Sequence, residues 1–111
     1  MTVNATETVA AALRRMKLYD VSQLPVMRDG RIAGILDEED ILLEVFNNPK
    51  HFDEPVTQAM ASHLVTVQAD APLTQLLEIF KRGMVAIVMN GNEFAGLITR
   101  IDLLNWLRQR M

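Results

Sequence analysis

The chain repeats itself, and this internal repeat constrains the fold more than any other feature of its 111 residues. Residues 2–5 line up with residues 66–69 at an offset of 64, and from Pro25 onward the offset is 62, which indicates a two-residue deletion in one loop of the second copy. Six identical pairs share the second frame: Val26 and Val88, Met27 and Met89, Ala33 and Ala95, Gly34 and Gly96, Asp40 and Asp102, and Leu42 and Leu104. The repeat predicts two copies of one supersecondary unit.

The first copy reads as strand, helix, strand, strand, helix. A helix is predicted over residues 6–18, with Thr6 as N-cap, from apolar residues at helical spacing: Val9, Ala12, Leu13 and Met16. Apolar runs at 24–27 and 32–36 flank an Asp-Gly turn, which is a strong hairpin signal. Asp37 then caps a second helix, whose apolar positions are Ile41, Leu42, Val45 and Phe46.

The second copy repeats this plan, with strands predicted at residues 64–67, 85–89 and 94–98, an Asn90-Gly91 turn, and helices over 72–82 and from Thr99. We therefore assign residues 1–48 to a first repeat that lacks its opening segment, 49–63 to a linker with a short helix, and 64–111 to a second repeat. The fold class is mixed α/β. Because one unit alone leaves a sheet face exposed, we expect two β-α-β-β-α units packed with pseudo-twofold symmetry and clefts at their junction.

Composition excludes several classes of protein. The chain has no Cys, which removes disulfides and thiolate chemistry and fits a cytoplasmic location. Its formal charge of −3 argues against a nucleic-acid partner, and no apolar run approaches the roughly 20 residues that cross a membrane. His51 and His63 have no third metal ligand, no serine has a triad partner, and the Met residues are read as core fillers, so we predict neither a metal site nor catalytic residues.

The order of elements, the stretch Val21-Ser-Gln-Leu-Pro-Val26, and the two endings Gly34-Ile-Leu-Asp37-x-x-Asp40 and Gly96-Leu-Ile-Thr99-x-x-Asp102 resemble the CBS domain pair, or Bateman module. The second ending is further similar to the C-terminal regulatory region of cystathionine beta-synthases. The resemblance implies a non-catalytic sensor of AMP, ATP or S-adenosylmethionine that controls an attached catalytic domain. It also implies a homodimer assembled through helices.

The second ending has the chemistry that such a ligand requires. A strand that runs into a helix at Thr99 aims free N–H groups and a hydroxyl at one point, where a phosphate or carboxylate fits. Asp102 follows one turn later with oxygens that suit a ribose diol, and Ile101 lies between them. The alternative is a capping box in which Thr99 and Asp102 serve only the helix.

The first ending departs from the family pattern, since Asp37 replaces the hydroxyl residue and is followed by Glu38, Glu39 and Asp40. This acidic turn repels phosphate and tolerates a sulfonium or amino group better, although it also suits the helix dipole without any ligand. By family analogy one cleft joins Thr99 and Asp102 to Val21, Ser22 and Gln23. The opposite cleft joins Asp37 and Asp40 to His63 and Val65.

Two alternatives remain open from the sequence alone. In the first, the domain is a ligand-free dimerisation module whose endings are only helix caps. In the second, Trp106 beside the stripe of Leu103, Leu104 and Leu107 fills a partner surface instead of packing on its own sheet.

Overall fold

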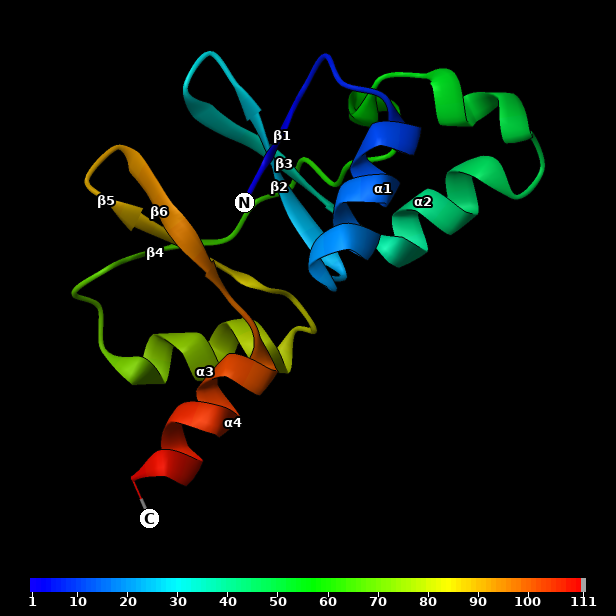
Figure 1. The fold of residues 1–111 in the computed structure, drawn as a ribbon. Helices are drawn as coiled ribbons and strands as arrows, with labels where there is room; N and C mark the ends of the chain where they lie inside the picture. Colours follow the sequence, from blue (N-terminus) through cyan, green and yellow to red (C-terminus); the bar gives the residue numbers. More distant parts are fainter. Residues whose placement is uncertain (111) are drawn as a thin grey trace. The chain divides into compact units, whose positions relative to one another are not determined.

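The computed structural model describes residues 1–110, which fold as two compact units, Met1–Leu64 and the residues from Val65 onward. Unit 1 contains β1 (Val3–Asn4), α1 (Val9–Tyr19), β2 (Gln23–Arg28), β3 (Arg31–Asp37), α2 (Glu38–Val45) and two short 3-10 helices, η1 (Pro49–Asp53) and η2 (Val56–Gln58). Unit 2 contains β4 (Thr66–Gln68), α3 (Leu73–Lys81), β5 (Ala86–Asn90), β6 (Glu93–Ile98) and α4 (Arg100–Gln109). Figure 1 shows both.

Each unit has the β-α-β-β-α order predicted from the repeat, so the fold class is confirmed. In each, the first strand pairs parallel with the second, and the second pairs antiparallel with the third. The registers also correspond, because Val26 lies opposite Gly34 and Val88 lies opposite Gly96. Both sheets carry an irregularity immediately after that pair. The two copies therefore share the same strand order, the same pairing register and an irregularity at the same position.

Two local predictions were wrong by one or two residues. Thr8, not Thr6, caps α1 by accepting a hydrogen bond from the Ala11 N–H at 3.1 Å. Thr6 is unavailable because its hydroxyl donates to the Asn4 side chain at 2.8 Å, which holds a turn ahead of the helix. In unit 2 the hairpin loop comprises residues 91–92, since Asn90 already pairs with Glu93, and Gly91 supplies the positive φ of 63°.

The core of unit 1 includes the segment that follows the first repeat. Val56, on η2, is fully buried with Leu24, Leu36 and Met16, and Met60 packs against the same cluster. Ala61 forms two backbone hydrogen bonds with Ile35, at 2.8 and 2.9 Å, along the outer strand β3. Residues 49–61 therefore belong structurally to unit 1.

The core of unit 2 is smaller and has no equivalent segment within the described residues. Its cluster of buried side chains comprises Val67, Leu76, Ile79 and Ala86. Ala86 occupies the position of Leu24 in the repeat, so unit 2 has a small side chain where unit 1 has a large one. No residue described on α4 is buried.

A two-armed ion pair fixes the start of unit 1. Arg15 donates from both terminal nitrogens to the Glu7 carboxylate at 2.8 and 3.0 Å, and also to the Thr2 carbonyl at 2.9 Å. The Asn4 N–H donates to Glu7 at 2.8 Å. These bonds, first the one from Arg15, lower the pKa of Glu7 to about 2. The pair ties residues 2–4 to α1.

We expect Glu7→Gln to remove about 1 kcal/mol of stability at pH 7, since both side chains are about a third exposed and solvent screens the pair. Because the folded pKa lies below the unfolded value of about 4.5, this stabilisation is complete above pH 4.5 and disappears as pH falls towards 2. Urea unfolding from pH 7 to 3 should therefore show a shallower loss of stability for the variant. Glu54→Gln, which removes the same charge at another exposed position, is the control.

Candidate functional site

The loop between β6 and α4 brings Thr99 and Asp102 together. The Asp102 Oδ2 atom accepts hydrogen bonds from the Thr99 N–H at 2.8 Å and from the Thr99 hydroxyl at 2.9 Å. The Asp102 N–H in turn donates to the Thr99 hydroxyl at 3.4 Å. This is the capping box that the sequence left open as an alternative.

The capping box leaves several polar groups at this helix start without a partner among the described residues. The Asp102 Oδ1 atom accepts no hydrogen bond, and the N–H groups of Arg100 and Ile101 have no acceptor. Asp102, Ile101 and Arg100 are all exposed. The site therefore offers two N–H donors and one acceptor oxygen to a solute, and Arg100 adds a positive charge to the first turn of α4.

The corresponding loop of unit 1, between β3 and α2, is more occupied and more negative. Asp37 caps the helix by accepting from the Asp40 N–H at 2.8 Å, as predicted. The first N–H of α2, from Glu38, donates to the Ser22 carbonyl at 3.2 Å. Partial burial, and next the charge of Asp37, raise the pKa of Asp40. This ending therefore offers an anion fewer free N–H donors, and its acidic side chains repel an anion more strongly.

The residues Val21, Ser22 and Gln23 lie against this first ending. Gln23 pairs with Asp37 across the β2–β3 ladder, and the Ser22 carbonyl binds the start of α2. Val21 and Glu38 line a hollow of about 140 Å³ beside the end of α1. The predicted partnership of these three residues with Thr99 and Asp102 involves both units, and it stays a prediction.

The other residues assigned to the second cleft belong to different units. His63 is exposed in unit 1 and lies outside regular secondary structure. Val65 belongs to unit 2, where its carbonyl accepts from the Ile87 N–H at 3.1 Å and its side chain packs against the buried core of that unit. Their proximity to Asp37 and Asp40 also stays a prediction.

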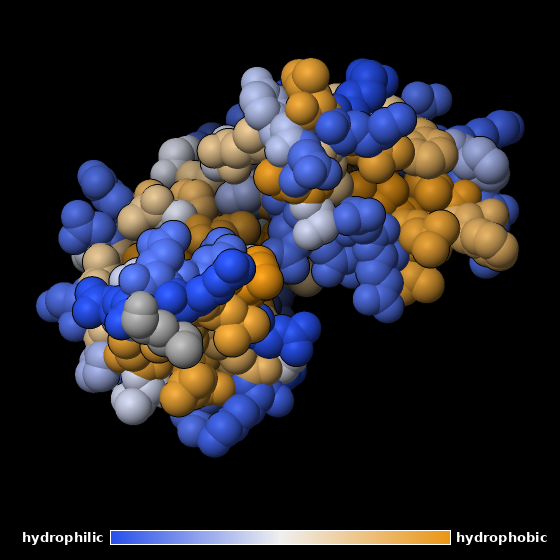
Figure 2. All heavy atoms as spheres, turned by 60° about the horizontal axis from the view of Figure 1, so that its bottom comes forward, coloured by the Kyte–Doolittle hydropathy of each residue, from blue (hydrophilic) through white to orange (hydrophobic). Residues whose placement is uncertain are grey.

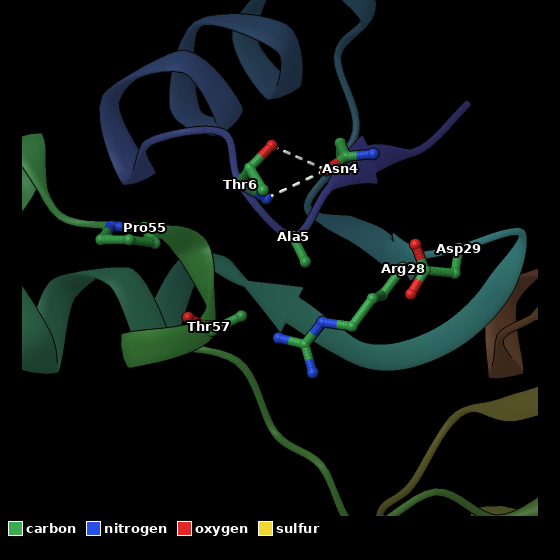
Figure 3. A pocket seen from close by; sticks show the side chains of 7 residues that line it. All are labelled: Asn4, Ala5, Thr6, Arg28, Asp29, Pro55 and Thr57. Atoms are coloured by element: carbon green, nitrogen blue, oxygen red, sulfur yellow. Dashed lines mark hydrogen bonds between the residues drawn. The ribbon is translucent and has the colours of Figure 1, made fainter.

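Unit 1 also has a hollow of about 370 Å³, which the sequence did not predict. It is lined by residues from three separated segments: Asn4, Ala5, Thr6, Arg28, Asp29, Pro55 and Thr57. Figure 3 shows the Arg28 side chain extending into it from the β2–β3 hairpin. Since these segments meet only in the folded unit, no local motif indicates the hollow.

Within residues 1–110 no three His, Asp or Glu side chains gather as a metal site. No helix in the same range combines the length and apolar character needed to cross a bilayer. Met16 is buried and Met60 packs on the core, in line with their expected role. Trp106 is 39% exposed, and the Arg110 guanidinium stacks on its ring at 3.9 Å.

Comparison with known proteins matches both units of the chain to one family. The family model described as "CBS domain" matches residues 1–47 and 56–109. A cystathionine beta-synthase of Dictyostelium discoideum is 26% identical over 113 residues, covering 96% of this chain and 23% of that protein. An inosine-5'-monophosphate dehydrogenase of Rhodopirellula baltica is 32% identical over 108 residues, covering 93% and 19%.

The same fold is present in solved structures. A CBS-domain-containing protein of Agrobacterium tumefaciens superposes with a TM-score of 0.87 at 23% identity, covering 96% of this chain and 88% of that one. This chain thus matches nearly the whole of one such structure, and less than a quarter of each of the two enzymes.

Proposed function

The chain belongs to the CBS-domain family as a tandem pair, and from that premise we propose that it is a regulatory module that binds an adenosyl ligand at Thr99 and Asp102. In this proposal the module has no catalytic residues of its own. Val21, Ser22 and Gln23 complete the binding cleft in the folded pair. A cytoplasmic location is part of the proposal, because the chain contains no Cys.

The observation that carries the proposal is the set of unpartnered groups at the start of α4. The free N–H groups of Arg100 and Ile101 lie where the helix dipole is positive, so they suit a phosphate or carboxylate. The free Oδ1 atom of Asp102 suits a ribose hydroxyl as acceptor. The capping box supports this role, because it fixes the carboxylate in one orientation before a ligand arrives.

The charge of the two endings bears on the choice of ligand. The second ending has Arg100 beside its free donors, which favours the phosphates of AMP or ATP. The first ending has Asp37, Glu38, Glu39 and Asp40 in one turn, which favours the sulfonium of S-adenosylmethionine over a phosphate. We therefore propose phosphate-bearing ligands for the second ending only.

The partner of the module is an attached catalytic domain. The two curated relatives described above are enzymes of different chemistry, and this chain covers only 23% and 19% of their lengths. A cystathionine beta-synthase is one candidate host. Ligand binding would control the host only if the ligand favours one arrangement of the module over another.

The test is titration calorimetry of AMP, ATP and S-adenosylmethionine against the wild type and Asp102→Asn. An asparagine oxygen can still accept from Thr99, so the cap survives while the free carboxylate oxygen is lost. We expect at least tenfold weaker binding of whichever ligand binds the wild type. The corresponding change in unit 1, Asp40→Asn, is the matched control and should leave phosphate-ligand affinity within twofold. Equal affinities for Asp102→Asn and the wild type would remove the ribose role.

A second candidate function is a ligand-free dimerisation module. It is favoured by the fact that Thr99 and one Asp102 oxygen are already engaged in a helix cap. It is also favoured by Asp37, which replaces the hydroxyl at the first ending. Retained self-association, with no thermal shift from any of the three compounds, would support this candidate over the sensor.

A further inference from the structure

The hollow lined by Arg28 and Asp29 lies at the hairpin end of unit 1, away from the start of α2. Gln23 pairs with Asp37 at one end of the β2–β3 ladder, and Arg28 pairs with Arg31 at the other. Arg28 is five residues along β2 from Gln23, which amounts to about 17 Å in a strand. The hollow is therefore separate from the groups at the first ending.

The lining of the hollow is mostly polar, unlike the apolar patches of the surface. Figure 2 shows hydrophobic atoms gathered over α2 and, separately, over the α3 and α4 side of unit 2, and no residue of these helices lines the hollow. Only Ala5 and Pro55 are apolar among its seven lining residues. Its volume of about 370 Å³ lies within the range of about 300 to 1,000 Å³ that is usual for small-molecule sites. The hollow thus suits a small polar solute.

Two opposite charges line the hollow without neutralising each other. Arg28 and Asp29 are neighbours in the chain, yet neither takes part in an ion pair anywhere in residues 1–110. Figure 3 shows the Arg28 side chain extended from the hairpin towards Thr57 on η2. Arg28 also lies opposite Arg31 across the ladder, and like charges in such a pair are destabilising. An anion bound by Arg28 would relieve that repulsion.

Unit 2 fills the corresponding place with a side chain. Gln68, the counterpart of Asn4 in the repeat, accepts from the Gly91 N–H at 3.0 Å and donates to the Gly91 carbonyl at 3.2 Å. It thereby ties β4 to the turn between β5 and β6. The side chain of Asn4 is one methylene shorter, and its Oδ1 atom instead accepts from the Thr6 N–H at 3.0 Å and from the Thr6 hydroxyl at 2.8 Å (Figure 3). The same place in unit 1 therefore stays open.

The backbone is the same at the two places, so the difference lies in the side chains. The Ala5 N–H donates to the Met27 carbonyl at 2.8 Å, and the Ala69 N–H donates to the Met89 carbonyl at the same distance. The remaining wall of the hollow comes from Pro55 and Thr57, in the segment that has no equivalent within the described part of unit 2. The hollow is thus a property of unit 1 and not of the repeat.

We propose that this hollow binds a small zwitterion of the amino-acid class, with its carboxylate on Arg28 and its ammonium group on Asp29. A guanidinium binds a carboxylate through two parallel N–H donors, and the Asp29 carboxylate accepts hydrogen bonds from an ammonium group. The hydroxyl of Thr57 supplies a further partner. A phosphate suits the hollow less well, because the charge of Asp29 repels it. This site is additional to the adenosyl site and does not depend on it.

The test is an NMR titration of the isotope-labelled chain with the common L-amino acids and glycine, and with acetate and methylammonium as probes that carry only one of the two charges. We expect at least one amino acid to shift the amide signals of Ala5, Asp29 and Thr57 at millimolar concentration. Each single-charge probe should bind at least fivefold more weakly. Acetate that binds as tightly as the best amino acid would overturn the zwitterion, and unshifted signals with every amino acid would overturn the site.

Substitution of the two charged residues checks their roles. Arg28→Met removes the charge from a side chain of similar length, and Asp29→Asn removes a carboxylate at a position whose φ of 52° asparagine tolerates. We expect each to weaken amino-acid binding at least tenfold. Arg31→Met is the matched control, because it makes the same change at the opposite position of the ladder, outside the lining. It should leave the affinity within twofold, and an equal loss in Arg31→Met and Arg28→Met would exclude a specific role for Arg28.

Asn4→Gln tests whether the open space itself matters. The longer side chain can reach the backbone of Asp29, the counterpart of Gly91, and form the tie that unit 2 contains. We expect this variant to lose binding at least tenfold while it unfolds at no lower temperature than the wild type. Asn4→Ala removes the same bonds to Thr6 without filling the hollow, so its affinity should stay within twofold. Wild-type affinity in Asn4→Gln, or an equal loss in both variants, would contradict the proposal.

Discussion

Truncation of Leu24 to alanine is expected to lower the free energy of unfolding of unit 1 by about 3 kcal/mol. Leu24 is fully buried, pairs with Leu36 across the β2–β3 ladder, and belongs to the same cluster as Met16 and Val56. The truncation removes three carbon atoms from water-free packing and leaves a cavity that the two sheet strands cannot close. Urea unfolding, followed by hydrogen exchange of the β2 and β3 amides, measures the loss.

Leu18→Ala makes the same chemical change at a side chain that is 76% exposed at the end of α1. It should cost less than about 0.5 kcal/mol. If both truncations cost the same, the described core of unit 1 is wrong. Unit 2 already has alanine at the position of Leu24, so we also expect its amides to exchange faster than those of unit 1.

Gly34→Ala is expected to cost unit 1 about 2 kcal/mol. A Cβ at residue 34 would lie 2.6 Å from the Met60 sulfur and 2.7 Å from the Ala61 carbonyl oxygen, well inside van der Waals contact. The Met60 side chain can rotate away. The Ala61 backbone cannot retreat without losing its two hydrogen bonds to Ile35.

Gly96→Ala is the matched control, because Gly96 occupies the same register in unit 2 and a Cβ there meets nothing within 4 Å. We expect it to be neutral, or stabilising by up to about 0.5 kcal/mol through the unfolded chain. Thermal unfolding of both variants, with exchange at the Ala61 amide, makes the comparison. A Gly34→Ala protein as stable as Gly96→Ala would show that residues 60–61 do not pack on β3.

The sequence predicted the elements of both units because local signals and the repeat agreed. Helix-capping residues were readable where nothing competes for the side chain, as with Asp37 and Thr99. Thr6 failed as a cap because Asn4, two residues earlier, captures its hydroxyl. The repeat supported these local predictions, because both copies give the same order of elements.

The sequence predicted which residues lie at the site, but not which of their hydrogen-bonding atoms the helix cap leaves free. Spacing alone does not distinguish a capping box from a ligand site, and the structure shows that the cap uses only one Asp102 oxygen. The engagement of the Glu38 N–H by Ser22 depends on the α1–β2 loop reaching α2, a contact between segments about 16 residues apart. Such tertiary contacts leave no periodic signal in the sequence.

The docking of residues 49–61 onto unit 1 has a consequence for how genes for such modules can be cut and rejoined. The sequence repeat ends near residue 48, whereas the folded body that contains it ends at Leu64. A recombination crossover at codon 48 would separate unit 1 from Val56, which is fully buried in its core, and from Ala61, which hydrogen-bonds to the edge strand β3. We therefore expect crossovers after codon 64 to yield folded chimaeras, and crossovers at the visible repeat boundary to yield aggregation-prone ones.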